Sequence, residues 1–273
     1  MSMRWEAGLH TAVGRHVDAA AYGQYIGRWS RLFVPALLAA AEITEGDRIL
    51  DVATGSGEAA LMALSAVGDS GLVIGADISP AMLEAASGRL FDRPFWPVAA
   101  DGQALAFPDA SFDAVLCQLG LMFFPNPARG LEEFRRVLRP GRCAAVCVIS
   151  SPARAPPWGI LAETLGHYLP DQTEALHLSF ALADAARLQR LFGAAGFRDV
   201  RVTRETREGI VASFDEYWAP IEAGTGQMPQ AYLTLPEPSR RAVREEVRAR
   251  LSRFESNGRL VMSVEMLIGA GRA

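Results

Sequence analysis

The chain contains no lysine, so all 27 of its Lys and Arg positions are arginine. This absence excludes enzymes that form a Schiff base on a lysine, and Walker-type ATPases, whose phosphate loop needs one. Cysteine is also scarce. The three cysteines, Cys117, Cys143 and Cys147, lie in apolar segments without CxxC or zinc-like spacing. We therefore predict buried thiols, with neither a disulfide framework nor a metal site.

Long apolar segments are absent as well. The most apolar stretch, "LFVPALLAAA" at 32–41, is too short to span a bilayer and contains Pro35. The first residues, "MSMRWEAGLHTAVGRH", lack the apolar core of a signal peptide. A net charge of -4 provides no global field that attracts nucleic acid. We predict a cytoplasmic monomer or homodimer with no stable membrane insertion and no nucleic-acid partner.

What is present is a regular alternation of elements. Apolar, strand-like segments alternate with helical patterns from residue 48 to about 204, and a last strand-like segment lies near the end. The predicted strands are 48–52, 71–77, 95–101, 112–120, 143–150, 197–205 and 259–271. This order predicts an α/β fold with a doubly wound, mostly parallel, seven-stranded sheet. In such sheets ligands bind at the carboxyl ends of the strands.

Two segments lie outside the alternation. Residues 1–45 are predicted to form a helical N-terminal cover, and residues 207–258 a helical insert that serves as a lid over an acceptor site. The remaining segments, 46–206 and 259–273, form the predicted core domain. The insert contains an arginine-rich helix, for which we favour a solvated face over an anionic partner. Its apolar residues Val243, Val247, Leu251 and Phe254 fall on one stripe.

The stretch "DVATGSGEAA" at 51–60 is a strand end followed by a glycine turn and a helix start. Gly55 and Gly57, with Ala60, fit the G-x-G-x-x-G/A fingerprint of dinucleotide-binding turns. Asp77 ends the second strand, where a carboxylate can accept hydrogen bonds from both hydroxyls of a ribose. These features suit NAD and S-adenosylmethionine equally.

Three further features favour S-adenosylmethionine. Asp51 directly precedes the turn, where its charge would repel a pyrophosphate but suit an ammonium group. Asp101 ends the third strand and can accept a hydrogen bond from an adenine amine. A Pro-Gly turn in "VLRPGRCAAVCVIS" precedes the fifth strand.

The order of "ILDVATGSGEAAL", "GADIS", "AADGQALAFPDASFDAVLC" and "EFRRVLRPGRCAAV" resembles the class I S-adenosylmethionine-dependent methyltransferases. Within this class it resembles the branch with the ubiquinone/menaquinone C-methyltransferases and many small-molecule methyltransferases. The resemblance covers about residues 48–150. It implies a Rossmann-like methyltransferase fold, S-adenosylmethionine as cofactor, and transfer of its methyl group by in-line displacement to O, N or C of a small acceptor.

The resemblance also implies roles for individual residues. The methionine part of the cofactor is assigned to Asp51, Ala53, Gly55 and Gly57, and the ribose to Asp77. The adenine is assigned to Ile78, Met82, Asp101, Gly102 and Gln103. The methionine amine and the sulfonium are assigned to Gln118. Aromatic residues of the N-terminal segment either close over the cofactor or belong to the core: Tyr22, Tyr25 and Trp29.

A catalytic base is not evident in the sequence. His10 and His16 lie in the N-terminal segment, and His167, after the fifth strand, is a weak catalytic candidate. Aromatic residues that either line an apolar acceptor pocket or pack in the core are Phe123, Phe124, Trp158, Tyr217 and Trp218.

The slot after the fourth strand reads "QLGL". Relatives that methylate exocyclic base nitrogens carry Asn/Asp-Pro-Pro-Tyr/Phe there, so we do not expect methylation of DNA or RNA bases. The apolar insert favours a small, partly apolar acceptor. Two alternatives remain at this point: an NAD(P)-dependent oxidoreductase that uses the same turn, and a non-catalytic S-adenosylmethionine-binding protein.

Overall fold

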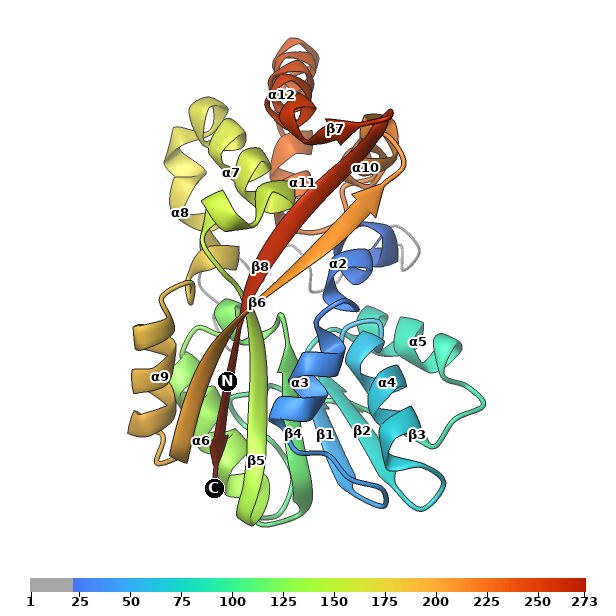
Figure 1. The fold of residues 1–273 in the computed structure, drawn as a ribbon, viewed down its shortest axis with the longest axis vertical. Helices are drawn as coiled ribbons and strands as arrows, with labels where there is room; N and C mark the ends of the chain where they lie inside the picture. The colour runs from blue at the N-terminus through green and yellow to red at the C-terminus, as the bar shows by residue number, and fades with distance from the viewer. Residues whose placement is uncertain (1–21) are drawn as a thin grey trace, which may run out of the picture.

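The computed structural model describes residues 22–273, and their strands form one twisted sheet in the order β3-β2-β1-β4-β5-β8-β6 (Figure 1). The five strands β1 to β5 are parallel, whereas β8 runs antiparallel to β5 and β6. This path confirms the mostly parallel, seven-stranded sheet; a two-residue strand, β7, pairs with β8 beside it. The strands are β1 (Arg48–Val52), β2 (Leu72–Asp77), β3 (Phe95–Ala99), β4 (Phe112–Gln118), β5 (Leu138–Ile149), β6 (Arg198–Val211), β7 (Glu255–Ser256) and β8 (Arg259–Arg272).

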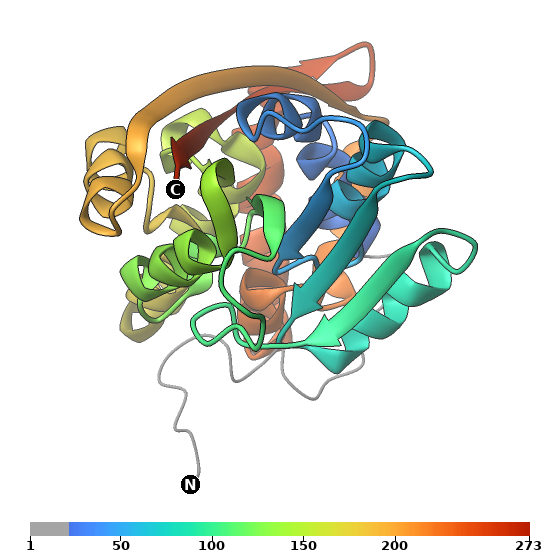
Figure 2. The same ribbon diagram turned by 90° about the horizontal axis from the view of Figure 1, so that it is seen from below.

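Helices cover both faces of the sheet. One face carries α3 and α4, which pack on each other, and the other carries α6 and α9, which also pack together (Figure 2). The helix α5 makes the crossover from β2 to β3. These helices are α3 (Val34–Ala40), α4 (Glu58–Val67), α5 (Pro80–Arg89), α6 (Pro127–Val137) and α9 (Ala185–Ala194).

Local capping signals set where three of these helices begin. The side chains of Ser79, Asn126 and Asp184 each accept a hydrogen bond from a backbone N–H in the first turn of α5, α6 and α9. In α5 and α6 a proline occupies the first helical position, where its missing N–H is not needed. These caps fix the start of each of the three helices.

A helical layer lies above the carboxyl ends of the parallel strands (Figure 1). Its helices are α7 (Pro156–Tyr168), α8 (Thr173–Leu176), α10 (Phe214–Glu222), α11 (Gln227–Leu233) and α12 (Glu237–Leu251). Two short N-terminal helices, η1 (Gly23–Gly27) and α2 (Arg28–Ser30), follow each other without a break, and η1 contacts α10. The layer therefore closes the edge of the sheet at which ligands bind in this architecture.

The strand β6 joins the sheet to the helical layer. It continues to Val211, past the predicted end at 205 and past the predicted domain boundary at 206, because its last residues pair with β8. Val211 lies opposite Leu260, and the two strands rise together to α10 and α12 (Figure 1). β5 also begins earlier than predicted, at Leu138 rather than 143.

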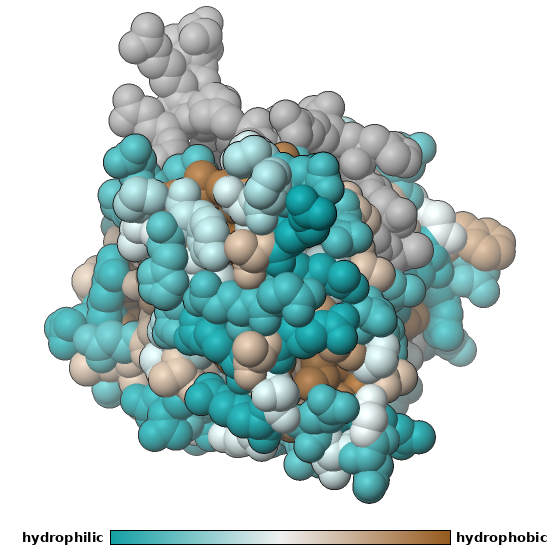
Figure 3. Space-filling view, turned by 90° about the horizontal axis from the view of Figure 1, so that it is seen from above, coloured by the Kyte–Doolittle hydropathy of each residue, from teal (hydrophilic) through white to brown (hydrophobic). Residues whose placement is uncertain are grey.

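The arginine-rich helix α12 packs on α7 through its apolar stripe. Val243, Val247 and Leu251 are buried, and Arg244 and Arg248 form ion pairs with Asp215. Seen from above, the surface of the layer is mostly hydrophilic (Figure 3). Within residues 22–273, no helix is long and apolar enough to cross a membrane.

Candidate cofactor and acceptor site

A cavity of about 310 Å³ lies between the carboxyl ends of the strands and the helical layer. Ten of the twelve residues predicted to bind the cofactor line it: Tyr25, Ala53, Gly55, Asp77, Ile78, Met82, Asp101, Gly102, Gln103 and Gln118. The other two lie directly beside this lining, Asp51 in the last part of β1 and Gly57 in the glycine turn. The structure therefore brings together side chains that the sequence spreads over nearly a hundred positions.

The glycine turn has the backbone shape that its residues allow. Gly55 (φ +55°) and Gly57 (φ +82°) are both in the left-handed region, and Gly57 is the N-cap of α4. A Cβ atom on Gly57 would lie 3.0 Å from Leu90 Cδ1, so the turn also packs closely on the end of α5. Ala53, which precedes the glycines, is left-handed too (φ +56°). A non-glycine residue in this region stores strain, and such residues concentrate at functional sites.

Asp77 connects the second strand to the glycine turn. Its Oδ2 accepts a hydrogen bond of 2.9 Å from the backbone N–H of Gly55, and its Oδ1 accepts one of 2.8 Å from Ser79 N–H. The side chain is buried, and burial raises its pKa, an effect that the backbone hydrogen bonds oppose. A buried carboxylate at the cavity wall with two N–H donors is well placed to accept further donors from a ligand.

Asp51 lies fully buried beneath the same turn. Its Oδ2 accepts a hydrogen bond of 2.6 Å from Thr54 Oγ1, whereas its Oδ1 has no hydrogen-bond partner among the described residues. Burial, together with the nearby charge of Asp77, raises the pKa of Asp51 to about 7, although the hydrogen bond from Thr54 opposes the shift. Since buried carboxylates are normally satisfied, this oxygen marks a place where a ligand cation would be stabilised.

The wall formed by the segment after β3 is fixed by local hydrogen bonds. Asp101 Oδ1 accepts from the backbone N–H of Gln103 (2.9 Å), and Gln103 Oε1 accepts from the N–H of Asn126 (2.8 Å). A Cβ atom on Gly102 would lie 2.4 Å from the ring of Phe124, so only glycine fits between this ring and β1. This wall, the platform after β3, is thus made by backbone packed closely against an aromatic ring.

At the end of β4, Gln118 connects the sheet to the N-terminal helices. Its Nε2 donates to both the carbonyl oxygen and Oγ of Ser30, each at 3.1 Å, whereas its Oε1 is buried without a partner among residues 22–273. Ser30 was not predicted from the sequence. The pairing spans 88 positions, and no local pattern signals it.

The remaining part of the lining is uncharged. It is formed by Tyr25, Met122, Phe123, Ile149, Trp158, Ser179 and the segment 223–228 of the insert, with Gln230. Among the described residues that line the cavity there is no arginine or histidine, and the only carboxylates are Asp77 and Asp101. The hydroxyl of Tyr25 and the indole Nε1 of Trp158 are buried and have no hydrogen-bond partner in the part of the chain that the structure describes.

Of the five aromatic residues considered for an acceptor pocket, Phe123, Phe124 and Trp158 line the cavity. Tyr217 and Trp218 do not; they pack behind it in α10, where Tyr217 donates a hydrogen bond to the carbonyl of Pro157 (2.7 Å). Tyr217 therefore supports the start of α7, from which Trp158 projects.

The weak catalytic candidate His167 lies elsewhere. It is close to the C-terminal end of α7, its side chain is 68% exposed, and its Nδ1 lies 3.4 Å from Glu246. It does not line the cavity, so the structure gives it no contact with a bound acceptor. His10 and His16 lie outside the described residues.

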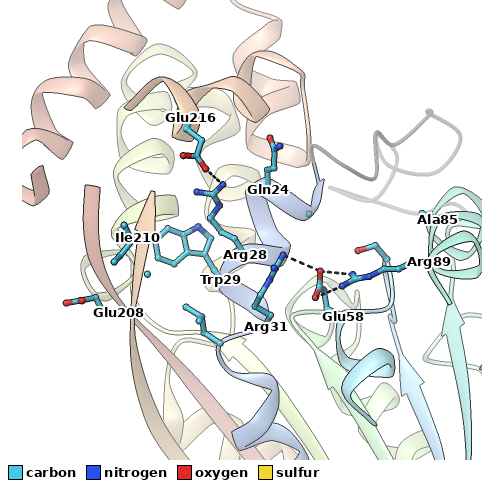
Figure 4. Close-up of a pocket in the computed structure, with 14 residues that line it drawn as sticks. Gln24, Arg28, Trp29, Arg31, Glu58, Ala85, Arg89, Glu208, Ile210 and Glu216 are labelled. Carbon is cyan, nitrogen blue, oxygen red and sulfur yellow. Dashed lines mark hydrogen bonds and ion pairs between the residues drawn. The ribbon is translucent and has the colours of Figure 1, made fainter. Parts of the chain in front are cut away.

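A second pocket of about 700 Å³ lies on the other side of α2. Its arginines are paired with glutamates: Arg28 with Glu216, and Arg31 and Arg89 with Glu58, at 3.8 and 2.7 Å (Figure 4). These pairs tie α2 both to α10 and to α4.

Comparison with known proteins agrees with this geometry. Residues 50–145 match the model of a family described as "Methyltransferase domain". A demethylmenaquinone methyltransferase of Mycobacterium sp. (strain KMS) is 34% identical over 217 residues, which cover 76% of this chain and 90% of that protein. The ubiquinone/menaquinone biosynthesis C-methyltransferase UbiE of Xanthomonas campestris is 36% identical over 149 residues, or 52% of this chain and 57% of that protein.

Solved structures show the same fold. A methyltransferase structure from Bacillus halodurans has a TM-score of 0.58 at 19% identity and covers 88% of this chain and 97% of that one. The phosphoethanolamine N-methyltransferase 2 of Haemonchus contortus, solved with phosphomonomethylethanolamine and S-adenosylhomocysteine, has a TM-score of 0.59 at 16% identity. It covers 94% of this chain and 57% of that one.

Fold, site and relatives together define a class I S-adenosylmethionine-dependent methyltransferase, with S-adenosylmethionine as its methyl donor. Within this class, the chain belongs to the family that contains the demethylmenaquinone methyltransferases and the UbiE C-methyltransferases. Nothing in these comparisons favours an NAD(P)-dependent oxidoreductase or a non-catalytic binding protein. The cavity suits the donor because the unpartnered amide oxygen of Gln118 lines it, the unpartnered carboxylate oxygen of Asp51 is buried beside it, and Asp77 and Asp101 add carboxylates to its wall.

Proposed function

We propose that the enzyme methylates an uncharged, ring-bearing small molecule that carries an oxygen beside the methylated atom, as a quinol does. The observation that carries this proposal is the acceptor side of the cavity, which combines apolar walls with two buried, unpartnered groups, Tyr25 Oη and Trp158 Nε1. The relatives' names, demethylmenaquinone methyltransferase and ubiquinone/menaquinone biosynthesis C-methyltransferase, support a quinone-like acceptor.

The donor is proposed to lie along the strand ends. Asp77 would accept hydrogen bonds from the ribose hydroxyls, and Asp51 with the turn would hold the methionine part. The adenine would lie between Ile78 and Met82 on one side and the platform after β3 on the other, with Asp101 and Gln103 at its edge. When bound, S-adenosylmethionine supplies a methyl group that its sulfonium has already activated.

Charge decides the acceptor class. A charged acceptor buried here would meet no cationic side chain among the described residues that line the cavity, where the only charged side chains are the two carboxylates on the donor side. Because burying an unpaired charge costs on the order of several kcal/mol of desolvation, the lining disfavours acceptors that carry a permanent anionic group such as a phosphate or a carboxylate. An uncharged aromatic ring would instead gain from contact with Phe123, Met122 and Ile149.

Tyr25 and Trp158 would hold the acceptor's oxygen. An indole N–H can only donate a hydrogen bond, so its partner must be an acceptor atom. Burial raises the pKa of Tyr25 well above its usual value, and the nearby Tyr217 adds to this, so the hydroxyl stays protonated and can donate. Two donors on a ring hydroxyl oxygen lower the pKa of that hydroxyl, so that it releases its proton to solvent and the neighbouring ring carbon of the phenolate becomes more nucleophilic. Attack of that carbon on the methyl group breaks the bond from sulfur to methyl and leaves neutral S-adenosylhomocysteine, and the ring proton on the methylated carbon is then released to water. The protein would therefore activate the acceptor by hydrogen bonding and alignment, without a histidine base.

The N-terminal segment and the insert are proposed to close the site from opposite sides. Tyr22, Tyr25 and Ile26 reach the cavity from the first helices, and residues 223–228 reach it from the insert. This arrangement suits the cover and lid that we expected of 1–45 and 207–258. The expectations of a cytoplasmic location and of a monomer or homodimer stay predictions.

The test is methyl transfer from labelled S-adenosylmethionine to a panel of hydroquinones, phenols, amines and phosphorylated amines. We expect product with the hydroquinones, and Trp158→Phe should lower kcat/KM for them by about 10- to 100-fold, the scale of one buried hydrogen bond. Trp218→Phe is the matched control, since Trp218 lies outside the cavity and its Nε1 already donates to Glu222 (3.0 Å). Product with the phosphorylated amine alone would contradict the proposal.

A further inference from the structure

The side-chain amide of Gln118 can adopt only one of its two orientations. Its nitrogen lies 3.1 Å from the carbonyl oxygen of Ser30 and 3.1 Å from Ser30 Oγ. A backbone carbonyl can only accept hydrogen bonds, so the group that faces it must be the amide NH₂. The reverse orientation would place two acceptor oxygens against each other. The position of Ser30 therefore decides which end of the amide remains for the cavity.

The end that remains is Oε1, a buried acceptor without a partner among the described residues. The neighbouring thiol of Cys147 does not satisfy it, because Cys147 Sγ is directed at Met266 Sδ (3.4 Å). Gln118 itself lines the cavity. Buried polar groups of this kind almost always have a partner in the functional state. The missing partner must be a donor.

The surroundings of this oxygen favour a cationic donor. Asp51 and Leu116 are paired across β1 and β4, so the buried carboxylate and Gln118 lie at the same edge of the sheet. Asp51 Oδ1 is the second unpartnered acceptor there, and no arginine of residues 22–273 lines the cavity to compete for it. Of the groups that the methyl donor carries, the ammonium of its methionine part is the cation with free N–H groups.

We propose that Ser30 is a positioning residue that orients the amide of Gln118, so that Gln118 Oε1 accepts a hydrogen bond from the ammonium group of the donor. Both contacts with Ser30 contribute, the backbone carbonyl by excluding the flipped amide and Oγ by holding the nitrogen in place. Because Ser30 lies on α2, recognition of the ammonium depends on the N-terminal helices being packed over the strand ends. The inference concerns the donor and does not depend on which acceptor is methylated.

The experiment compares S-adenosylhomocysteine with its analogue that has hydrogen in place of the α-amino group, by calorimetric titration. The readout is the ratio of the two Kd values. A variant that only loses stability changes both Kd values alike, because both ligands see the same folded fraction. For the wild type we expect a preference of about tenfold or more for S-adenosylhomocysteine, as for one hydrogen bond to a charged group.

The ratio should fall several-fold in Gln118→Met, in which Asp51 alone still favours the ammonium, and by less in Ser30→Ala, which keeps only the carbonyl contact. Gln103→Met is the matched control: it makes the same change at the adenine end, so it should weaken both ligands equally and keep the wild-type ratio. A wild-type ratio in Gln118→Met or in Ser30→Ala would overturn the inference. The absence of any heat with S-adenosylhomocysteine would instead overturn the donor assignment, and this inference with it.

Discussion

The backbone N–H of Gly55 donates a hydrogen bond of 2.9 Å to Asp77 Oδ2, so the turn after β1 is held in place by the carboxylate at the end of β2. The second carboxylate oxygen accepts from Ser79, the N-cap of α5. One side chain thus fixes the turn, starts a helix and faces the cavity. A substitution there acts on the shape of the site as well as on its chemistry.

We expect Asp77→Ala to weaken binding of S-adenosylhomocysteine by about 100-fold or more, since it removes a charged acceptor together with the support of the turn. Asp77→Asn keeps one acceptor oxygen and should have an intermediate affinity. Calorimetric titration measures both, and a thermal melt of each variant shows that it is folded. Unchanged affinity in Asp77→Ala would refute the ribose assignment.

Asp51 makes donor binding depend on pH. Its pKa of about 7 lies above its ordinary value of 3.8, so ionisation costs free energy in the unliganded fold. This cost is absent below pH 3.8 and is complete above pH 7. Asp51 therefore lowers the free energy of unfolding as the pH rises from about 4 to about 7. A bound ammonium group reverses the preference of Asp51 for its protonated form, because the positive charge stabilises the ionised carboxylate.

We therefore expect the affinity for S-adenosylhomocysteine to rise from about pH 6 to pH 8, with release of a proton on binding below pH 7. Titrations in two buffers with different ionisation enthalpies measure that proton. Asp51→Asn should abolish most of the pH dependence, although Asp77, whose pKa is also raised, keeps a smaller part at lower pH. Equal pH dependence in the wild type and in Asp51→Asn would exclude Asp51 as the titrating group.

Gly209 shows how β6 and α2 pack. A Cβ atom there would lie 2.2 Å from the ring of Trp29, which contacts Trp158 edge-on with ring centroids 6.0 Å apart. We expect Gly209→Ala to lower the free energy of unfolding by about 1–3 kcal/mol, as overpacking does. Gly88→Ala is the matched control: it lies in α5 with open space around it and should be neutral or stabilise by up to about 1 kcal/mol. Equal thermal melts would contradict the close packing.

The ion pair of Arg28 with Glu216 joins α2 to α10 (Figure 4). Both side chains are partly exposed, so the pair contributes at most about 1 kcal/mol, and we expect Arg28→Ala to weaken S-adenosylhomocysteine binding only a few-fold. The coupling is measured by a double-mutant cycle with Glu216→Ala. If the two single effects simply add, the pair does not hold the N-terminal helices over the donor.

The sequence predicts this fold well where local rules act. The positions of Ser79, Asn126 and Asp184 predict helix N-termini, because a side-chain oxygen there can cap the nearest free backbone N–H groups. The pair Gly55 and Gly57 predicts a tight turn, because such turns need a positive φ, which other residues rarely adopt. These signals need only neighbouring residues, and they place the turn, Asp77 and Asp101 at one edge of the sheet.

Contacts between distant segments could not be predicted in this way. Ser30 is one serine among many until β4 brings Gln118 against it. Nothing in the sequence distinguishes Trp158 from Tyr217 and Trp218 as a candidate for the pocket. Only Trp158 reaches the cavity, because the side of a helix that faces a ligand depends on how the helix packs. β6 extends to Val211 because β8 pairs with it, although its own sequence is largely polar there.

The most direct test of the account is calorimetric titration of the wild-type protein with S-adenosylhomocysteine and, separately, with NADH. The account predicts saturable one-to-one binding of S-adenosylhomocysteine and no heat of binding with NADH. Binding of NADH in place of S-adenosylhomocysteine would contradict it, because the glycine turn would then hold a pyrophosphate and not the methionine part of a methyl donor.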